Sequence, residues 1–299
     1  MALYPQARAA VAQSAEEPSV FDPGFDIARS RAAALEVAAA ELGEHVDEVV
    51  DLDAHGVRCR LYRPAGADAL VVHLHGGGFV FHDIDVHDAA ARRLANRTGM
   101  AVLSVDYRRP PEDRFPAAPD DVDTVLGWLE NEGPSHGLDL PAFAHGDSAG
   151  GNLALVAALR NPGRFLGVAL LYPFLDPEAG FDSYRTATDG FDPREAAWYW
   201  EQYAGADDLT DPDLAPLRSD RLGSLPPTLV ITAEHDPLRD EGEELALRIA
   251  EQGGRVVATR YLGQVHGFWR HVDVFDAAEP VTGQVAAFLR QQLAAPPLP

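Results

Sequence analysis

A single serine, Ser148, stands between two glycines where an apolar segment meets a helical one. Residues 138–144 have the pattern of a short buried strand, and residues 148–160 have that of a helix. A strand that turns sharply into a helix through glycine-x-serine-x-glycine forms a nucleophile elbow. A Cβ at either glycine would collide with a neighbouring element, and the turn holds the serine hydroxyl clear of the backbone. Ser148 is therefore predicted to be a nucleophile. The residues that shape the turn are Gly146, Asp147 and Gly150.

A histidine and three glycines follow a second apolar segment, residues 70–74. Glycines after a buried strand are unfavourable unless the backbone has a role, because glycine loses more conformational freedom on folding than any other residue. The predicted role is hydrogen-bond donation to an oxyanion by the amides of Gly77, Gly78 and Ala149. A flexible strand-to-helix turn is the alternative. The remaining residues of this motif are His75 and Gly76.

A serine hydroxyl is a poor nucleophile at neutral pH unless a base takes its proton. In such a fold the partners follow the serine in the order acid, then histidine. Asp236 ends a buried strand-like segment, and only His266 and His271 lie beyond it. His266 follows another strand-like segment, with a strand expected at residues 255–261, so it is expected at the carboxyl edge of the sheet, where catalytic groups gather. We predict His266 as the base and Asp236 as the acid that orients it. Glu234 and Asp240 are the competing acids.

Six motifs occur in order along the chain. They are His75-Gly-Gly-Gly-Phe79, Asp106-Tyr-Arg108, Phe115-Pro-Ala-Ala118, Gly146-Asp-Ser-Ala-Gly-Gly151, Asp236-Pro-Leu-Arg-Asp-Glu-Gly242 and His266-Gly-Phe268. Together they resemble the hormone-sensitive-lipase-like esterases, the bacterial family IV carboxylesterases, over about residues 45 to 290. The resemblance implies an α/β-hydrolase fold with a helical cap. It also implies a catalytic triad of Ser148, Asp236 and His266.

Two features depart from the family pattern. The segment usually written Y-R-L-A-P-E is here Tyr107-Arg-Arg-Pro-Pro-Glu112, and His145 precedes the elbow where the family usually has a small residue. Neither departure touches the predicted triad. His145 is expected to be a hydrogen-bonded histidine near the end of a strand, although it could alter the packing behind the serine.

The order of elements predicts an α/β fold with a mostly parallel eight-stranded sheet flanked by helices. Two strand-like segments, 46–53 and 57–63, come first, strand-like and helical segments then alternate from residue 70 to about 172, and the alternation resumes at 227. Residues 1–44 read as N-terminal cap helices, and the proline- and aspartate-rich segment 176–222 reads as a cap insertion around a helix. Residues 45–175 and 223–299 are then the catalytic domain.

The predicted cap carries several large aromatic side chains. One reading is that some of them line the substrate pocket, as apolar walls with few polar groups would do. The alternative is that they only attach the cap to the body of the protein. The candidates are Phe21, Phe25, Trp198, Trp200 and Tyr203.

Composition excludes several kinds of partner. The net charge is −23, and all 24 of the basic residues other than histidine are arginine, since the chain contains no lysine. Nucleic acid and anionic membranes would be repelled. The acidic stretch from Asp207 to Asp213 lacks the spacing of a calcium-binding loop and is expected to be a solvated loop. The single cysteine, Cys59, lies in an alternating strand and cannot form an internal disulfide.

These observations predict a serine carboxylesterase that acts on short- to medium-chain acyl esters through an acyl-enzyme. Amide or formamide hydrolysis, or deacetylation, on the same triad is the alternative. A non-catalytic small-molecule receptor is disfavoured by the presence of His266. No metal or organic cofactor is expected, and a homodimer is plausible. The N-terminus lacks the pattern of a secretory signal, so the cytoplasm is the expected location.

Overall fold

The computed structural model describes residues 2–205 and 208–295 and contains one eight-stranded sheet. The strand order is β1-β2-β4-β3-β5-β6-β7-β8, with β2 antiparallel to β1 and to β4 and all other neighbours parallel. The strands are β1 (Glu48–Ala54), β2 (Val57–Arg63), β3 (Leu70–Leu74), β4 (Ala101–Val105), β5 (Ala142–Asp147), β6 (Val168–Leu171), β7 (Thr228–His235) and β8 (Val256–Val265). The predicted α/β-hydrolase fold is confirmed.

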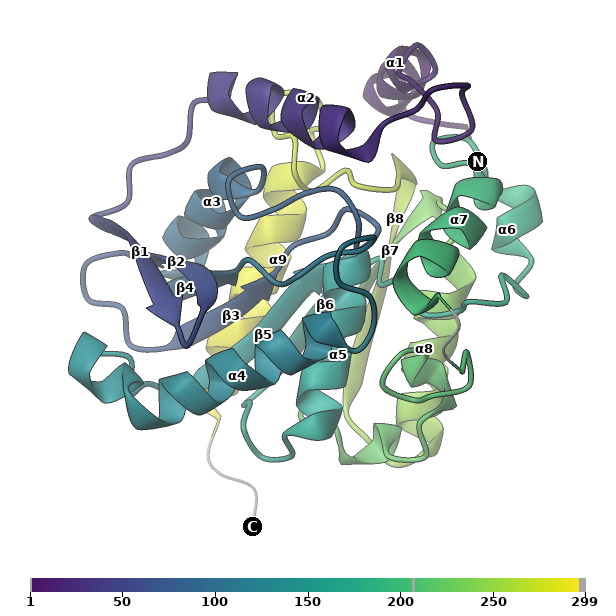
Figure 1. The fold of residues 1–299 in the computed structure, drawn as a ribbon. Helices are drawn as coiled ribbons and strands as arrows, with labels where there is room; N and C mark the ends of the chain where they lie inside the picture. The colour runs from purple at the N-terminus through teal and green to yellow at the C-terminus, as the bar shows by residue number, and fades with distance from the viewer. Residues whose placement is uncertain (1, 206–207, 296–299) are drawn as a thin grey trace.

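Helices cover both faces of the sheet and its carboxyl edge (Figure 1). The helices are α1 (Pro5–Ser14), α2 (Ile27–Ala40), α3 (Asp88–Thr98), α4 (Ala117–Asn131), α5 (Ala149–Arg160), α6 (Ser183–Thr186), α7 (Pro193–Ala204), α8 (Arg239–Glu251) and α9 (Ala278–Ala294). The described residues also form short 3₁₀ helices at Gly133–His136, Pro216–Arg218 and Leu222–Ser224.

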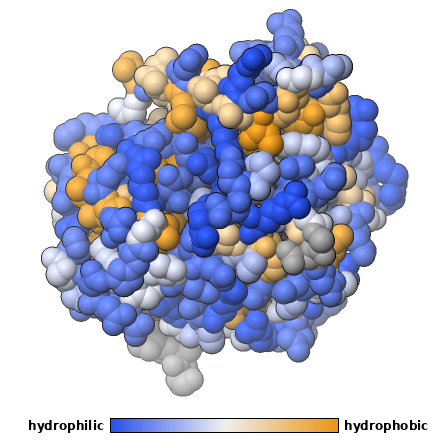
Figure 2. All heavy atoms as spheres, in the orientation of Figure 1, coloured by the Kyte–Doolittle hydropathy of each residue, from blue (hydrophilic) through white to orange (hydrophobic). Residues whose placement is uncertain are grey.

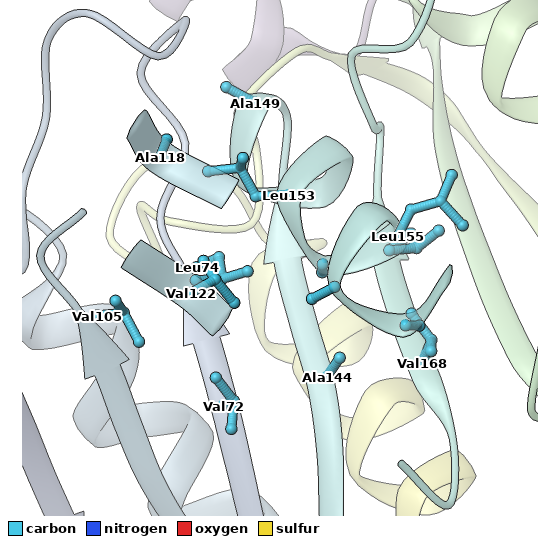
Figure 3. Packing of buried hydrophobic residues seen from close by; sticks show 14 of the residues in the cluster. Val72, Leu74, Val105, Ala118, Val122, Ala144, Ala149, Leu153, Leu155 and Val168 are labelled. Atoms are coloured by element: carbon cyan, nitrogen blue, oxygen red, sulfur yellow. The ribbon is translucent and has the colours of Figure 1, made fainter. Parts of the chain in front are cut away.

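Two apolar cores lie on opposite faces of the sheet. One core joins the sheet to α4, α5 and α8, and the other joins it to α3 and α9. In the first, Val72 and Leu74 of β3 face Val122 of α4 and Leu153 of α5 (Figure 3). Because helices cover both faces, the central strands β3 to β6 are buried at every position, as parallel strands require.

The carboxyl edge of the sheet faces α1, α2 and α7 (Figure 1). Parallel strands all have their C-terminal ends at this edge. The loops after β3, β5, β7 and β8 therefore meet beneath these helices. The predicted motifs begin where these strands end. Segments that are far apart in the sequence are thereby brought to one place.

Two predicted boundaries were wrong. The strand expected at 138–144 is β5 at Ala142–Asp147, because Leu138 closes the preceding 3₁₀ turn through its amide and Pro141 has no N–H for a sheet ladder. β5 therefore runs up to the elbow itself. The strand expected at 255–261 continues as β8 to Val265, directly before His266.

The face of the molecule shown in Figure 2 is mostly hydrophilic with separate apolar patches. Over residues 2–205 and 208–295, no helix combines the length and apolar character that a membrane span needs.

Candidate active site

Ser148 occupies a strained turn between β5 and α5. Its backbone has φ 55° and ψ −121°, a conformation that non-glycine residues rarely adopt. The amide of Ser148 donates to Leu171 of β6 (2.9 Å), and its carbonyl accepts from Phe174 (3.0 Å). These bonds hold the turn against the neighbouring strand and leave the hydroxyl facing the carboxyl edge of the sheet.

The two glycines of the elbow are required by close backbone packing. A Cβ on Gly146 would lie 2.1 Å from the carbonyl oxygen of Gly150. A Cβ on Gly150 would lie 2.0 Å from the carbonyl oxygen of Leu74 in β3. Neither backbone atom can move aside without disrupting α5 or β3. The steric reason proposed for this sequence pattern therefore applies here.

A hydrogen-bonded chain links Ser148 to His266 and Asp236. The Ser148 hydroxyl lies 2.9 Å from Nε2 of His266, and Nδ1 of His266 lies 2.8 Å from Oδ2 of Asp236. Asp236 is fully buried, and its other oxygen accepts from the amide of Leu238 (2.9 Å). Gly267 follows the histidine at φ +78°, so the chain turns back directly after the imidazole. The structure thus brings together the three residues predicted to act as a triad.

The other candidate acids, Glu234 and Asp240, and the other candidate histidine, His271, make their contacts away from Ser148. Glu234 accepts from the amide of Gly263 (2.8 Å), and Asp240 accepts from the amide of Ser183 (2.9 Å). His271 lies 3.7 Å from Glu41, beyond the end of α2. None of the three takes part in the hydrogen-bonded chain from Ser148.

The glycine loop after β3 has the conformation that only glycine adopts easily. Gly77 and Gly78 have φ of +115° and +60°. Among the described residues, neither of their amides donates a hydrogen bond, so both are free to bind an external acceptor. A Cβ on Gly78 would lie 2.3 Å from the ring of Tyr199 in α7, which covers the loop directly.

The supporting residues fix this loop to the elbow. The amide of Gly76 donates to Oδ1 of Asp147 (3.0 Å), and a Cβ on Gly76 would lie 2.6 Å from Oδ2. Nδ1 of His75 donates to the carbonyl of Gly76 (2.9 Å), while its ring stacks on Tyr107 at 4.2 Å. Tyr107 in turn donates to the carbonyl of His75 (2.7 Å). The loop is therefore held rigidly beside Ser148.

Two of the five aromatic pocket candidates are part of the core. Tyr203 is fully buried and stacks on Phe79 at 3.8 Å, and Trp200 packs against Phe174 at 4.6 Å. This is the arrangement expected from the alternative reading, in which they join α7 to the body of the protein.

The other candidates lie further out, between the N-terminal segment and α7. Phe25 makes edge contacts with Phe81 (6.1 Å) and Trp198 (6.3 Å). Phe21 is half exposed and lies under the guanidinium of Arg194 at 5.2 Å. Phe25 and Trp198 thus connect the two predicted cap segments above the glycine loop.

Sequence reasoning missed two aromatic residues in contact with His266, Tyr172 (4.7 Å between ring centroids) and Phe191. The rings of Phe191 and His266 lie 5.2 Å apart, and Phe191 also lies 6.2 Å from Tyr199. Phe191 therefore lies against the imidazole, and its neighbour Tyr199 lies against the glycine loop. A phenylalanine shortly before a helix start gives no sequence signal of its own.

Arg31 of α2 was also missed. Its guanidinium donates to the carbonyls of Val80 (2.8 Å) and Pro110 (2.7 Å) and pairs with Glu112 (2.9 Å). It therefore attaches the N-terminal segment to the loop that follows the glycines.

A cluster of buried histidines lies behind the elbow. His145 is hydrogen-bonded, as expected, and its partner is His73 on the neighbouring strand (2.9 Å between the Nδ1 atoms). Burial lowers the pKa of His73 to about 3 and holds the pKa values of His87 and His145 well below the ordinary range. Burial has the opposite effect on Asp147, whose pKa is raised, although the charge of Arg270 opposes this shift.

The acidic stretch forms turns in the part that is described, from Asp208 onward; Asp207 lies outside the described residues. The carboxylate of Asp208 accepts from the amide and the hydroxyl of Thr210, both at 2.8 Å. Asp211 accepts from the amide of Asp213 (2.8 Å). These carboxylates stabilise turns.

Comparison with known proteins agrees with this geometry. Residues 71–270 match the family described as having the α/β-hydrolase fold. The chain is 36% identical to the carboxylic ester hydrolase LipN of Mycobacterium tuberculosis, over 90% of this chain and 77% of the relative. This chain belongs to the α/β-hydrolase family. The predicted place among hormone-sensitive-lipase-like esterases is likewise confirmed.

Further relatives cover most of the hydrolase. The chain is 32% identical to an ethyl acetate hydrolase of Pseudomonas putida, over 81% of this chain and 80% of the relative. It also resembles the solved structure of a hyperthermophilic esterase from Pyrobaculum calidifontis, with a TM-score of 0.86 and 33% identity over 99% and 100% of the two chains. The similarity to this solved hydrolase therefore includes the N-terminal segment and the insertion.

Proposed function

We propose that this hydrolase cleaves carboxylic esters with Ser148 as nucleophile, His266 as general base and Asp236 as the residue that orients the imidazole. The hydrogen-bonded chain at 2.9 and 2.8 Å is the observation that carries the proposal. His266 takes the hydroxyl proton at Nε2 while its Nδ1–H donates to Asp236, which stabilises the imidazolium. The histidine then protonates the leaving alcohol and activates the water that releases the acid.

The enzyme class is that of a carboxylic ester hydrolase, the class named for several relatives at 32–36% identity. We propose that the amides of Gly77, Gly78 and Ala149 stabilise the negative charge of the tetrahedral intermediate. Fixed donors that need no reorganisation are worth about 3 to 4 kcal/mol each in serine hydrolases. The rigid attachment of Gly76 to Asp147 supports this role.

The proposed substrates are esters of short to medium acyl chains. Phe191 and Tyr199 limit the space beside His266 and Gly78, and the proposed cap of residues 1–44 and 176–222 covers that space. The net charge of −23 opposes docking on anionic lipid surfaces. We also propose that the protein forms a homodimer and is located in the cytoplasm.

A graded series of aryl esters tests the substrate class. We expect high activity from acetyl to hexanoyl esters, a steep fall for longer chains, and no increase in rate when the substrate forms micelles. One aryl amide in the series distinguishes ester from amide hydrolysis. Equal rates on emulsified long-chain triglycerides and on butyrate esters would overturn the proposed substrate class.

Labelling with an organophosphate tests the nucleophile. Mass spectrometry is expected to find one adduct, on Ser148, and the Ser148→Ala variant is expected to remain unlabelled. An adduct on a different serine, with loss of activity, would contradict the assignment.

A further inference from the structure

Three buried side chains converge behind the elbow from three segments of the chain. His73 lies on β3, His87 is the residue before α3, and Asp147 ends β5 (Figure 1). One nitrogen of each imidazole and one carboxylate oxygen all lie within 4.8 Å of one another. His73 and His87 are fully buried, and Asp147 is 3% exposed.

The backbone directs these groups to one side of the sheet. His73 is paired with His145 across β3 and β5, and Asp147 lies two residues further along β5. Side chains two residues apart on a strand point to the same face, so Asp147 and His145 share the face on which His73 lies. His87 approaches this face from α3, with its ring 5.8 Å from that of His73.

Each histidine leaves one nitrogen without a protein partner. Nδ1 of His73 is bonded to His145, but its Nε2 has no hydrogen-bond partner in the described part of the chain. Nδ1 of His87 likewise has no hydrogen-bond partner in the described part of the chain, and it lies 3.7 Å from Oδ1 of Asp147. A buried polar atom without a partner is costly, so an external group is expected to satisfy both nitrogens.

We infer that His73, His87 and Asp147 bind one divalent transition-metal ion, such as Zn²⁺ or Co²⁺. Two neutral imidazoles and one carboxylate are a donor set that these ions accept, and water would complete the coordination. An ion about 2.1 Å from each donor holds adjacent donors about 3.0 to 3.4 Å apart. The His87–Asp147 pair, at 3.7 Å, is already near this separation, and no two of the three donor atoms are more than 4.8 Å apart.

The ion would have a structural role, since His266 and Asp236 complete the hydrolytic chain without it. It would tie β3, the start of α3 and the end of β5 together, directly before Ser148. The partly buried guanidinium of Arg270, which donates to His82 (2.9 Å), adds positive charge to this region and is expected to limit the affinity. Because the donors are far apart in the sequence, no motif predicted this site.

Metal content and thermal stability test the inference. The full chain, produced in medium supplemented with Zn²⁺ or Co²⁺ and then dialysed, is expected to retain about one ion per chain by elemental analysis. The His73→Gln variant is expected to retain less than one tenth of that amount. The exposed His45 provides the matched control, since His45→Gln is expected to retain the full amount. The melting temperature of the wild-type protein is expected to rise with the ion and that of His73→Gln to stay unchanged.

Spectroscopy on the wild-type protein keeps the test decisive if His73→Gln fails to fold. X-ray absorption of the Co²⁺ form is expected to show two imidazole nitrogens in the coordination shell. A shell of oxygen atoms alone, retention of the full metal content by His73→Gln, or a crystal structure with a water molecule on these nitrogens after metal supplementation would overturn the inference. None of these experiments measures activity. A result that overturns the metal site would therefore not contradict the proposed ester hydrolysis.

Discussion

At the scale of single residues, the candidate site depends on short distances between groups from distant parts of the chain. Ser148 and His266 are 118 positions apart, yet their side chains form a 2.9 Å hydrogen bond. The serine conformation at φ 55° is held by bonds to β6 and by two glycines with no space for a Cβ. The site therefore combines local strain with contacts that only the folded chain provides.

Substitutions in the proposed triad are expected to abolish most turnover without unfolding the protein. We expect kcat/KM to fall about 10⁵- to 10⁶-fold for Ser148→Ala and His266→Ala, and about 10⁴-fold for Asp236→Asn, because the aspartate only orients the base. The double variant Ser148→Ala/His266→Ala is expected to be no worse than either single variant. Steady-state kinetics with a butyrate aryl ester, alongside circular dichroism, checks this. Additive losses in the double variant would argue against a shared catalytic unit.

Gly146→Ala is expected to destabilise the protein by about 3 kcal/mol or more, because its Cβ would meet backbone at 2.1 Å. Gly283→Ala is the matched control: this glycine lies exposed inside α9 and has nothing within 4 Å of its Cβ position. We expect that control to stabilise the protein by about 0.5 to 1 kcal/mol through helix propensity. Urea unfolding measures both, and a Gly146→Ala variant as stable as wild type would contradict the steric argument.

At the scale of elements, the helices at the carboxyl edge are attached by few but specific contacts. α7 enters the core through Trp200 and Tyr203, whereas α2 has no fully buried residue and depends on Arg31 for hydrogen bonds to the body of the protein. The predicted cap thus contains a firmly packed part and a lightly packed part. The lightly packed part is expected to open more readily.

Arg31→Ala is expected to loosen the segment that contains α2. Loss of hydrogen bonds from a charged group costs about 1.5 to 3 kcal/mol, so local opening should increase about 10-fold or more. Limited proteolysis with chymotrypsin, followed by mass spectrometry of cuts within residues 15–45, measures this opening. Arg29→Ala, at an exposed position of the same helix, is the control. Equal cleavage rates for both variants would show that Arg31 does not anchor the helix.

At the scale of the whole molecule, burial controls the titration of many groups. Burial raises the pKa of Cys59 above 9.0 and that of seven of the eight tyrosines above 10.0. These tyrosines are Tyr62, Tyr107, Tyr172, Tyr184, Tyr199, Tyr203 and Tyr261. At alkaline pH the folded protein therefore retains protons on these side chains that the unfolded chain releases.

The contribution of Cys59 and these tyrosines to the free energy of unfolding is expected to stay constant below about pH 8 and to fall as pH rises above 9 to 10. In this range the unfolded state binds fewer protons, and each retained proton contributes a slope of up to about 1.4 kcal/mol per pH unit. Urea unfolding from pH 8 to 10.5, with phenolate absorbance as a second signal, measures the effect. Cys59→Ala is expected to remove the earliest part of the fall. A curve that stays flat to pH 10.5 would be inconsistent with these shifts.

The sequence by itself determined the class of fold and the residues of the proposed triad. The elbow is a local feature, since two glycines, a serine and the flanking segments are contiguous around Ser148. The order of acid and histidine after the serine then left few candidates, and Asp236 and His266 are the pair that reach it. Local patterns and chain order were sufficient to predict these residues because the carboxyl ends of parallel strands all lie at one edge of the sheet.

Only the tertiary structure decided what surrounds the site. Phe191 against His266, Arg31 on the glycine loop, and the convergence of His73, His87 and Asp147 all join segments with no fixed spacing. The same holds for Tyr203, whose burial against Phe79 depends on how α7 lies on the sheet. Such contacts depend on how whole elements pack, and the packing of side chains between elements has no period or motif in the sequence.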